Sequence, residues 1–510
     1  MRQIKRIFSL AMVLALLCAL PLAPRAQGPG LTTANVSEYP VLIFHGGFHE
    51  LCINENTEEV ECVFAPGWIG DLIGARMDDL LGSMTSLNFD RAVDILKDIM
   101  WEWFGPIQMN EKGESINEGI TSDSAYWLDK NEDGPAFDTD WRLSPIENAD
   151  KLHQYIEYAC ERYGVEKFNL KPISGTIPIV LAYLDEHGYD RVASIHINLT
   201  THNGSTVFGE IFTRRMVLDM EALTKMPPFE QLGVDLTALS SVLRVLFEPG
   251  VLSVVERFVK LAAGRVIGRV YDEIIIPLVS TMPGLWTNVP QKDYAAAKRA
   301  LLGRNPNADL VEKLDAWQDI ALRADDIIRE AAQHVKVGVW AGYGVPLPPL
   351  GNSKGATSDF FVDTKYASLG ASCAPLNLPF LPTYRQRRAC GGHNHVSPDR
   401  MIDASTCLLP EQTWFALNKM HGWEDSYGGW YEWFLATDKP YVFENERYPQ
   451  FMEAVQRSYY NEEWGEDWYY DEYIPLERSE GNTFLLALKT IGLHLLKIWR
   501  WLLVLPLSWI

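Results

Sequence analysis

The sequence is poor in basic residues, and this shortage limits the kinds of partner that the protein can bind. Among 510 residues, 45 are Lys or Arg and 67 are Asp or Glu, which gives a formal net charge of -22. No cluster of Lys and Arg alternates with aromatic residues. Because proteins that bind nucleic acid place positive charge against the phosphates, we expect no nucleic-acid partner. An uncharged or weakly charged substrate fits the composition better.

Cysteine is also scarce, and its spacing argues against a metal site. The chain has seven cysteines, with no C-x-x-C pair and no Cys/His cluster at the spacing of a zinc site. The cysteine spacing therefore predicts no zinc site.

The first residues have the layout of an export signal. Residues 1–26 begin with basic residues, continue with an apolar stretch and end with small residues near Ala26. Cleavage there leaves six cysteines, an even number that permits up to three disulfides in an exported chain. We favour the short loop between Cys52 and Cys62 for one of them, whereas a buried thiol is an equal alternative for Cys160. The predicted location is extracellular or in the cell envelope.

The last stretch, residues 481–510, predicts a helix at a membrane surface. It is apolar and long enough to span a bilayer, but it contains four basic or titratable residues, Lys489, His494, Lys497 and Arg500. At 100° per residue these fall on one polar arc. A basic face opposite Leu, Ile and Trp suits an amphipathic helix lying in the interface. A tilted membrane anchor and a buried C-terminal helix are the alternatives.

Strand and helix patterns alternate over much of the chain. Strands are predicted at residues 39–48, 165–170 and 191–199, because these runs are apolar and rich in β-branched or aromatic residues. A helix is predicted from Ser144 to Gly164 and another after residue 176. This βαβ spacing indicates an α/β fold with a mostly parallel sheet and helices on both faces.

The alternation stops in the middle of the chain, which suggests an insertion. Residues 213–333 have helical periodicity throughout, so we expect a helical cap between a first core segment, 38–212, and a second, 334–435. Residues 436–480 are acidic and aromatic. We expect a surface subdomain with aromatic packing there, and carbohydrate contact through exposed aromatics is the alternative.

Two glycines are missing where the chain otherwise resembles a nucleophile elbow. In NLKPISGTIPIV, Ser174 lies between a strand and a helix, as in the pattern G-x-S-x-G, whose glycines let strand and helix pass closely. Pro172 and Thr176 occupy the glycine positions. Ser174 is the predicted nucleophile, and a structural serine is the alternative.

Candidates for the other catalytic groups follow Ser174 in the order nucleophile, acid, histidine. The predicted base is His421, with His393 and His395 as alternatives, whereas His45 and His202 are expected to hydrogen-bond within the fold at strand ends.

The acid has two candidates. Asp399 lies in HVSPDRMIDAST and is preferred because it is 22 residues before His421, since 421 - 399 = 22. Asp359 in SDFFVDTKYAS is the alternative, because it follows the strand-like VKVGVWAGYG more directly. The backbone N–H groups of Gly47, Phe48 and Gly175 are expected to form the oxyanion hole.

One acidic stretch resembles half of a calcium loop. Residues 129–140, DKNEDGPAFDTD, match D-x-N-x-D-G with Asp140 where a bidentate glutamate would be. A solvated acidic turn is the default interpretation, because flanking helices are not evident and Pro135 follows the glycine.

Six motifs in order resemble the lecithin:cholesterol acyltransferase-like lipases of the α/β-hydrolase superfamily, over roughly residues 38–425. They are FHGGF, FDTDWRLSP, VEKFNLKPISGTIPIVLAYL, INLTTHNGS, STMPGLWTNVP and SPDRMIDAST. The resemblance implies an α/β-hydrolase fold with an inserted cap and a Ser-His-Asp triad of Ser174, His421 and Asp399. The chain departs from the family pattern at Pro172, Ile173 and Thr176.

We therefore expect an exported serine ester hydrolase or acyltransferase that acts on lipid esters. This chemistry needs no metal ion and no organic cofactor. In this hypothesis the cap lines an acyl pocket and residues 481–510 hold the protein at a lipid surface. The alternative is a catalytically inactive hydrolase-like binding protein of the cell envelope, and the altered elbow residues Pro172 and Thr176 support it.

Overall fold

The computed structural model describes most of the chain between residues 37 and 477. The described residues are 37–45, 49–53, 61–86, 88–117, 119–120, 134–217, 266–351, 355–376, 378–422, 427–461 and 466–477. The predicted signal peptide, 1–26, and the predicted interfacial helix, 481–510, lie outside them. Among the described helices, none is both long and apolar enough to cross a bilayer.

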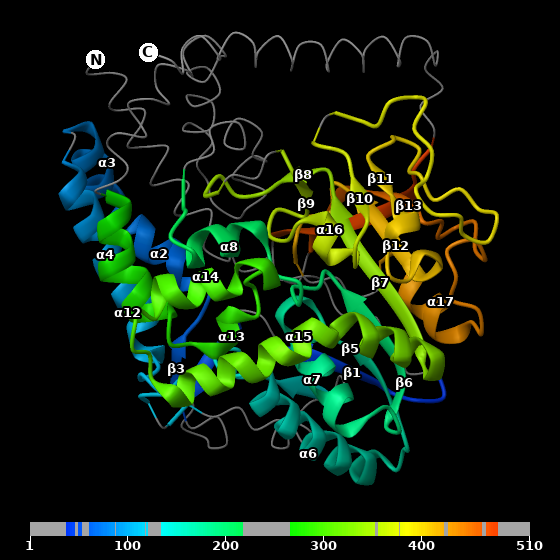
Figure 1. Ribbon diagram of the computed structural model, residues 1–510, viewed down its shortest axis with the longest axis horizontal. Helices are drawn as coiled ribbons and strands as arrows, with labels where there is room; N and C mark the ends of the chain where they lie inside the picture. The colour runs from blue at the N-terminus through cyan, green and yellow to red at the C-terminus, as the bar shows by residue number, and fades with distance from the viewer. Residues whose placement is uncertain are drawn as a thin grey trace.

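A central sheet of eight strands organises the fold (Figure 1). Its order is β14-β13-β12-β7-β6-β5-β1-β4, and every neighbouring pair is parallel except β13 and β14. The strands are β1 (Val41–His45), β4 (Ala136–Asp138), β5 (Phe168–Lys171), β6 (Val192–Asn198), β7 (Lys336–Tyr343), β12 (Thr413–Leu417), β13 (Phe451–Asn461) and β14 (Glu466–Pro475). The predicted α/β class with a mostly parallel sheet is confirmed.

Helices cover both faces of this sheet. Buried side chains of α6 (Pro145–Tyr163), α7 (Ile177–His187) and the C-terminal half of α15 (Ala308–His334) pack in one apolar cluster with β1, β5, β6 and β7. Trp340 and Trp414, which point to the opposite face, pack against α17 (Trp430–Ala436). Helix α15 thus belongs partly to the sheet core, although the sequence placed it wholly within the inserted cap.

The capping signals that predicted α6 are present in the structure. The Ser144 hydroxyl accepts the N–H of Ile146, and the Glu147 carboxylate accepts the N–H of Ser144 at 2.9 Å. Gly164 ends the helix in the left-handed conformation, with φ 65°, which a glycine adopts without a Cβ clash.

A separate helical layer packs beside the sheet (Figure 1). Its members are α2 (Trp68–Gly74), α3 (Met77–Thr85), α4 (Phe89–Phe104), α8 (Thr206–Phe212), a π-helical turn (Tyr271–Ile275), α12 (Ile276–Val279), α13 (Pro283–Trp286), α14 (Gln291–Leu301) and the first turns of α15. Its apolar cluster also includes Trp141 and Val345, which follow the carboxyl ends of β4 and β7 respectively. The layer therefore adjoins the carboxyl edge of the parallel strands. Residues 68–104, for which the sequence patterns predict no helix, contribute α2, α3 and α4 to this layer.

The described residues also form several short strands, one short helix and four 3-10 turns. They are β2 (Leu51–Ile53), β3 (Glu61–Phe64), β8 (Val345–Pro346), β9 (Thr357–Ser358), β10 (Ser372–Cys373), β11 (Ile402–Asp403), α16 (Thr364–Ala367) and 3-10 turns at Gly105–Ile107, Ser174–Thr176, Ala404–Thr406 and Pro410–Gln412.

The described part of residues 436–480 does not form the separate surface subdomain that the sequence predicts. Its two long strands, β13 and β14, pair antiparallel from Met452 with Pro475 to Asn461 with Glu466 and extend the central sheet.

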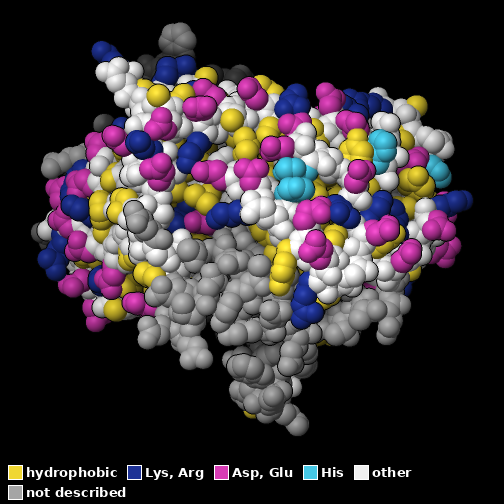
Figure 2. Space-filling model, turned by 90° about the horizontal axis from the view of Figure 1, so that it is seen from below, with side chains coloured by type: hydrophobic (Ala, Val, Ile, Leu, Met, Phe, Trp, Pro, Cys, Tyr) yellow, Lys and Arg dark blue, Asp and Glu magenta, His cyan; other side chains and the backbone are white. Residues whose placement is uncertain are grey.

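On the face shown in Figure 2, acidic and basic side chains of the described residues are intermingled, and the basic ones form no continuous patch there.

Candidate active site

Ser174 occupies a strained turn at the carboxyl end of β5. The strand ends at Lys171, and Ser174 begins the short turn that runs directly into α7. Its φ is 51°, in the left-handed region, which costs a non-glycine residue on the order of 1 to 2 kcal/mol. A strained strand-to-helix turn that presents a serine is the geometry of a nucleophile elbow. The turn forms here without the two usual glycines.

Thr176 replaces the second glycine and stabilises the turn with its hydroxyl group. Its Oγ1 accepts the N–H of Ile173 at 2.9 Å and donates to the Ile173 carbonyl at 2.8 Å. Thr176 is fully buried, and Ile173 is extended and bridges in parallel to Asn198 of β6. The branched side chain therefore closes the turn around Ser174 from within.

His421 lies within hydrogen-bond distance of Ser174. Its Nε2 is 2.8 Å from the serine Oγ, although the two residues are 247 positions apart. His421 follows the end of β12 by four residues, and its side chain is 17% exposed. A histidine at this distance can take the hydroxyl proton as a general base.

Asp359, and not Asp399, holds the other nitrogen of His421. Its Oδ2 is 2.8 Å from His421 Nδ1, and its carboxylate is fully buried. Its Oδ1 accepts the N–H groups of Phe361 at 2.9 Å and Val362 at 2.7 Å. These bonds fix the carboxylate, and the carboxylate in turn orients the ring.

The prediction of Asp399 as the acid was wrong, because the Asp399 carboxylate has other hydrogen-bond partners. Asp399 accepts the Tyr343 hydroxyl at 3.0 Å and the Ser397 hydroxyl at 2.5 Å, together with the N–H of Met401 at 3.1 Å. Burial and the charge of Asp399 raise the pKa of Tyr343, which keeps that hydroxyl protonated as a donor. Asp399 therefore organises its own loop.

The predicted oxyanion donors are only partly described. Gly175 follows Ser174 in the turn that leads into α7, so its N–H lies at the amino end of a helix, where backbone donors point outward. Gly47 and Phe48 lie outside the described residues. The strand before them, β1, is next to β5 in the sheet and parallel to it.

Aromatic side chains flank the triad. The Phe361 ring lies 5.0 Å from the His421 ring, and the Phe208 ring of α8 lies 5.5 Å from that of Phe361. Both phenylalanines are partly exposed. The approach to His421 on this side is therefore apolar and suits an uncharged group.

Four other histidines, at positions 45, 202, 393 and 395, make contacts away from Ser174. As expected, His45 hydrogen-bonds Asp138 at 2.7 Å and His202 hydrogen-bonds Thr200 at 2.8 Å, each at a strand end. His393 and His395, the alternatives for the base, pack on Phe443 instead.

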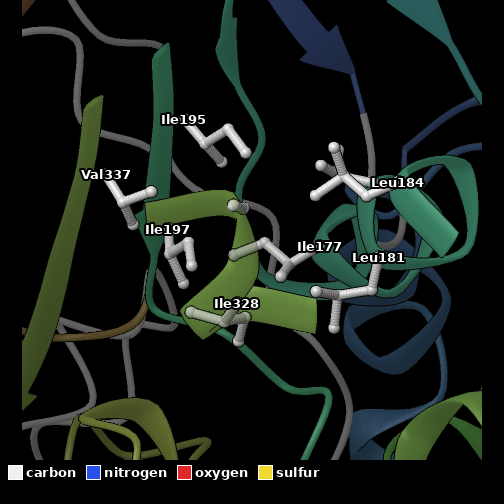
Figure 3. A pocket seen from close by; sticks show the side chains of 9 residues that line it. Ile177, Leu181, Leu184, Ile195, Ile197, Ile328 and Val337 are labelled. Carbon is white, nitrogen blue, oxygen red and sulfur yellow. The ribbon is translucent and has the colours of Figure 1, made fainter. Parts of the chain in front are cut away.

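A small void behind the elbow is not a binding site. It measures about 10 Å³ and lies between α7, α15 and the strands β6 and β7 (Figure 3). Only apolar side chains line it, among them Ile177, Ile197 and Ile328. A water molecule needs polar partners and at least roughly this volume. The void is therefore a dry packing defect of the core.

Asp140, the last residue of the stretch that resembles a calcium loop, forms an ion pair within the fold. Residues 129–133 lie outside the described residues. The Asp140 carboxylate binds Arg142 through Nε at 2.9 Å and Nη2 at 2.6 Å, and the arginine is fully buried. Arg142 also donates to the Ile107 carbonyl at 3.0 Å. Asp140 thus neutralises a buried cation, which speaks against a role in binding calcium.

The predicted Cys52–Cys62 disulfide is not formed in the structure. The two residues lie opposite each other in the antiparallel pair β2–β3. The described cysteines form no disulfide in the structure.

The sequence patterns ranked Asp359 second to Asp399 as the acid, and they did not predict the supporting role of Thr176. Asp359 had a usable signal, because it lies closer than Asp399 to the strand VKVGVWAGYG. The hydrogen bonds of Thr176 had none, because they depend on the turn itself.

Comparison with known proteins identifies no relative: no family model, no curated protein and no solved structure matches the chain.

Proposed function

We propose that this protein is a serine ester hydrolase or acyltransferase. The observation that carries the proposal is one continuous hydrogen-bonded chain, Ser174 Oγ to His421 Nε2 at 2.8 Å and His421 Nδ1 to Asp359 Oδ2 at 2.8 Å. These groups follow the strands β5, β9 and β12 in the order serine, aspartate, histidine, as in α/β-hydrolases.

The geometry suits a two-step acyl transfer. Ser174 Oγ attacks the ester carbonyl while His421 Nε2 takes its proton, and Asp359 stabilises the imidazolium that forms. The Gly175 N–H and a backbone donor from the loop after β1 stabilise the oxyanion. His421 then returns the proton to the leaving alcohol. Water or a second alcohol attacks the acyl-enzyme and loses its proton to His421. His421 then returns this proton to Ser174 Oγ as the ester bond to the serine breaks.

A lipid ester is the substrate class that we propose. The partly exposed pair Phe208 and Phe361 supports an apolar acyl group near His421. The helical layer at the carboxyl edge of the sheet is positioned as a cap would be. The export signal and the amphipathic segment 481–510 predicted from the sequence agree with a substrate at a membrane surface.

Labelling with a fluorophosphonate tests the proposal. The purified protein and Ser174→Ala are incubated with the probe, and the modified peptide is mapped. We expect labelling of Ser174 in the wild type and none in the variant, because the probe reacts only with an activated serine. Circular dichroism of both proteins shows that they are folded.

A folded wild-type protein that does not label would contradict the enzyme proposal. It would instead support the alternative of an inactive hydrolase-like binding protein, to which Pro172 and Thr176 would then be attributed. If labelling occurs, a screen of phospholipid and neutral ester substrates, with and without an added alcohol, distinguishes hydrolysis from acyl transfer.

A further inference from the structure

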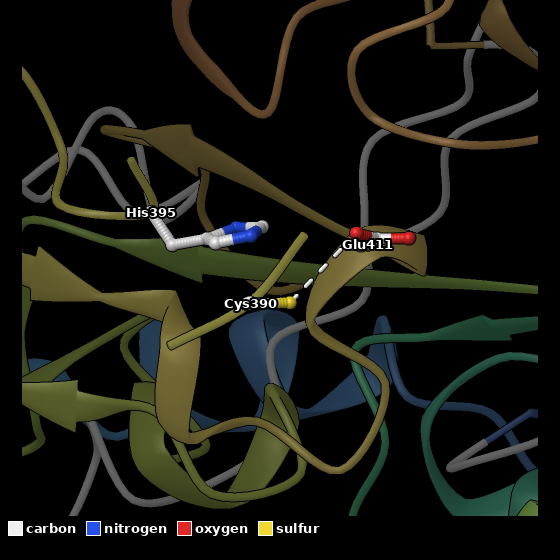
Figure 4. A group of neighbouring side chains, drawn as sticks. All are labelled: Cys390, His395 and Glu411. Atoms are coloured by element: carbon white, nitrogen blue, oxygen red, sulfur yellow. Dashed lines mark hydrogen bonds between the residues drawn. The ribbon is translucent and has the colours of Figure 1, made fainter. Parts of the chain in front are cut away.

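Three metal-binding side chains meet at the amino-terminal side of β12, away from Ser174. Cys390 and His395 lie in the loop after β10, and Glu411 lies in the turn Pro410–Gln412 just before the strand (Figure 4). One ligand atom of each lies within 4.8 Å of the other two. The Cys390 Sγ is 3.8 Å from a Glu411 oxygen.

The hydrogen bonds around His395 determine which of its two ring nitrogens carries the proton. The Gln450 amide nitrogen donates to the carbonyls of Pro410 at 2.7 Å and Thr413 at 3.0 Å, which fixes the amide orientation. The amide oxygen therefore faces His395 Nδ1 at 2.8 Å and must accept a hydrogen bond from an Nδ1–H group. The neutral ring then carries a lone pair on Nε2.

This lone pair is buried and has no donor. His395 is 0% exposed, and its Nε2 has no hydrogen-bond partner among the described residues. An unsatisfied buried acceptor is costly, about 1 to 3 kcal/mol. A ring nitrogen that is oriented by an amide on the other side is the arrangement in which histidine ligates metals.

We propose that Cys390, His395 and Glu411 bind a divalent cation of the zinc class. A thiolate, an imidazole and a carboxylate together favour zinc over magnesium or calcium, which prefer oxygen ligands alone. Zinc bonds of about 2.0 to 2.3 Å in a tetrahedron place ligand atoms roughly 3.3 to 3.8 Å apart, so the observed cluster needs only a small contraction. Water takes the fourth position.

The fold explains what the ion would do. Cys390 and Glu411 are partly exposed, so a cation can reach the site from solvent. Bound there, it would fasten the loop that carries residues 390–395 to the start of β12, the strand that leads to His421. The ligands come from two segments 16 residues apart, since 411 - 395 = 16, which is why spacing in the sequence did not predict the site.

Cobalt substitution tests the proposal directly. The full-length reduced protein is stripped of metal with a chelator and titrated with Co²⁺, then with Zn²⁺. We expect one equivalent to bind, with a thiolate-to-cobalt band in the near ultraviolet and the strong visible bands of tetrahedral cobalt. Zinc should abolish both bands and raise the melting temperature.

Matched variants locate the site. Cys390→Ala should abolish the thiolate band, and Glu411→Gln, which keeps the side-chain size, should weaken Zn²⁺ binding by about 10- to 100-fold. Cys62→Ala is the control, because Cys62 lies at the same 3.8 Å from a carboxylate, Glu50, but belongs to no three-ligand cluster among the described residues. Glu411→Gln remains informative if Cys390→Ala does not fold.

Two results would overturn the proposal. One is the absence of a thiolate band when Co²⁺ is added to the wild type. The other is a thiolate band that survives in Cys390→Ala, or a Zn²⁺ affinity that is unchanged in Glu411→Gln. Ser174→Ala should bind zinc as the wild type does, so failure of the metal site and failure of the proposed enzyme are separately visible.

Discussion

Asp359 binds His421 at two points. Its carboxylate Oδ2 lies 2.8 Å from the ring Nδ1, and its backbone carbonyl accepts the N–H of His421 at 2.7 Å. The first bond fixes the ring, and the second fixes the backbone that carries it. The loop that follows β9 therefore sets both the position and the rotation of the histidine that meets Ser174.

The two candidate acids should differ sharply in their effect on reactivity. In Asp359→Asn, the amide cannot stabilise an imidazolium and favours the wrong ring tautomer, so fluorophosphonate labelling should slow by roughly 10³- to 10⁴-fold. Asp399→Asn is the matched control, and its labelling rate should stay within a few-fold of the wild type. Equal losses in the two variants would contradict the assignment of Asp359.

Thr176 should be required for a stable elbow. Thr176→Val keeps the shape but leaves the buried N–H of Ile173 without its acceptor, so we expect a loss of about 1 to 3 kcal/mol in unfolding free energy. Labelling of Ser174 should also slow by about tenfold, which corresponds to an increase of about 1.4 kcal/mol in the activation free energy of labelling. Thr176→Ser, which keeps the hydroxyl, should restore both quantities. Urea unfolding and labelling rates measure them, and a valine variant as stable as the wild type would refute this role.

The buried pair Asp140 and Arg142 should be strongly coupled. Arg142→Met leaves a carboxylate 4% exposed and without its cation, which should cost roughly 3 to 5 kcal/mol of unfolding free energy. Removing the charge as well, in Arg142→Met with Asp140→Asn, should cost less than the sum of the single changes. Urea unfolding of the four proteins tests this, and additive effects would exclude the coupling.

His202 should make the fold sensitive to acid. Burial lowers the pKa of His202 from 6.5 to about 4. As pH falls below 6.5, the unfolded state takes up a proton that the folded state does not bind until about pH 4, so stability is lost across that window. The loss reaches on the order of 3 kcal/mol.

The variant His202→Asn isolates this contribution. The fall in unfolding free energy between pH 7 and pH 4.5 should be smaller in the variant by about 2 to 3 kcal/mol. An identical fall in both proteins would show that His202 does not cause the acid sensitivity.

Local signals predicted much of the fold. The helix α6 was predicted because its capping box and terminal glycine act within one or two turns of the chain. The strands β5 and β6 were predicted because their apolar runs are short and bounded by helices. The helices α2 to α4 were missed, and their buried residues pack in the separate helical layer rather than on the sheet.

The sequence by itself determined the parallel sheet, the position of Ser174 at the end of a strand and the order of the triad residues. Each depends on patterns a few residues long, in which neighbouring side chains decide the backbone conformation. Only the tertiary structure decided that Asp359 orients His421, that Thr176 closes the elbow and that Glu411 joins Cys390 and His395. These contacts depend on how long loops return to the sheet, and the length of a loop does not specify where its side chains meet others.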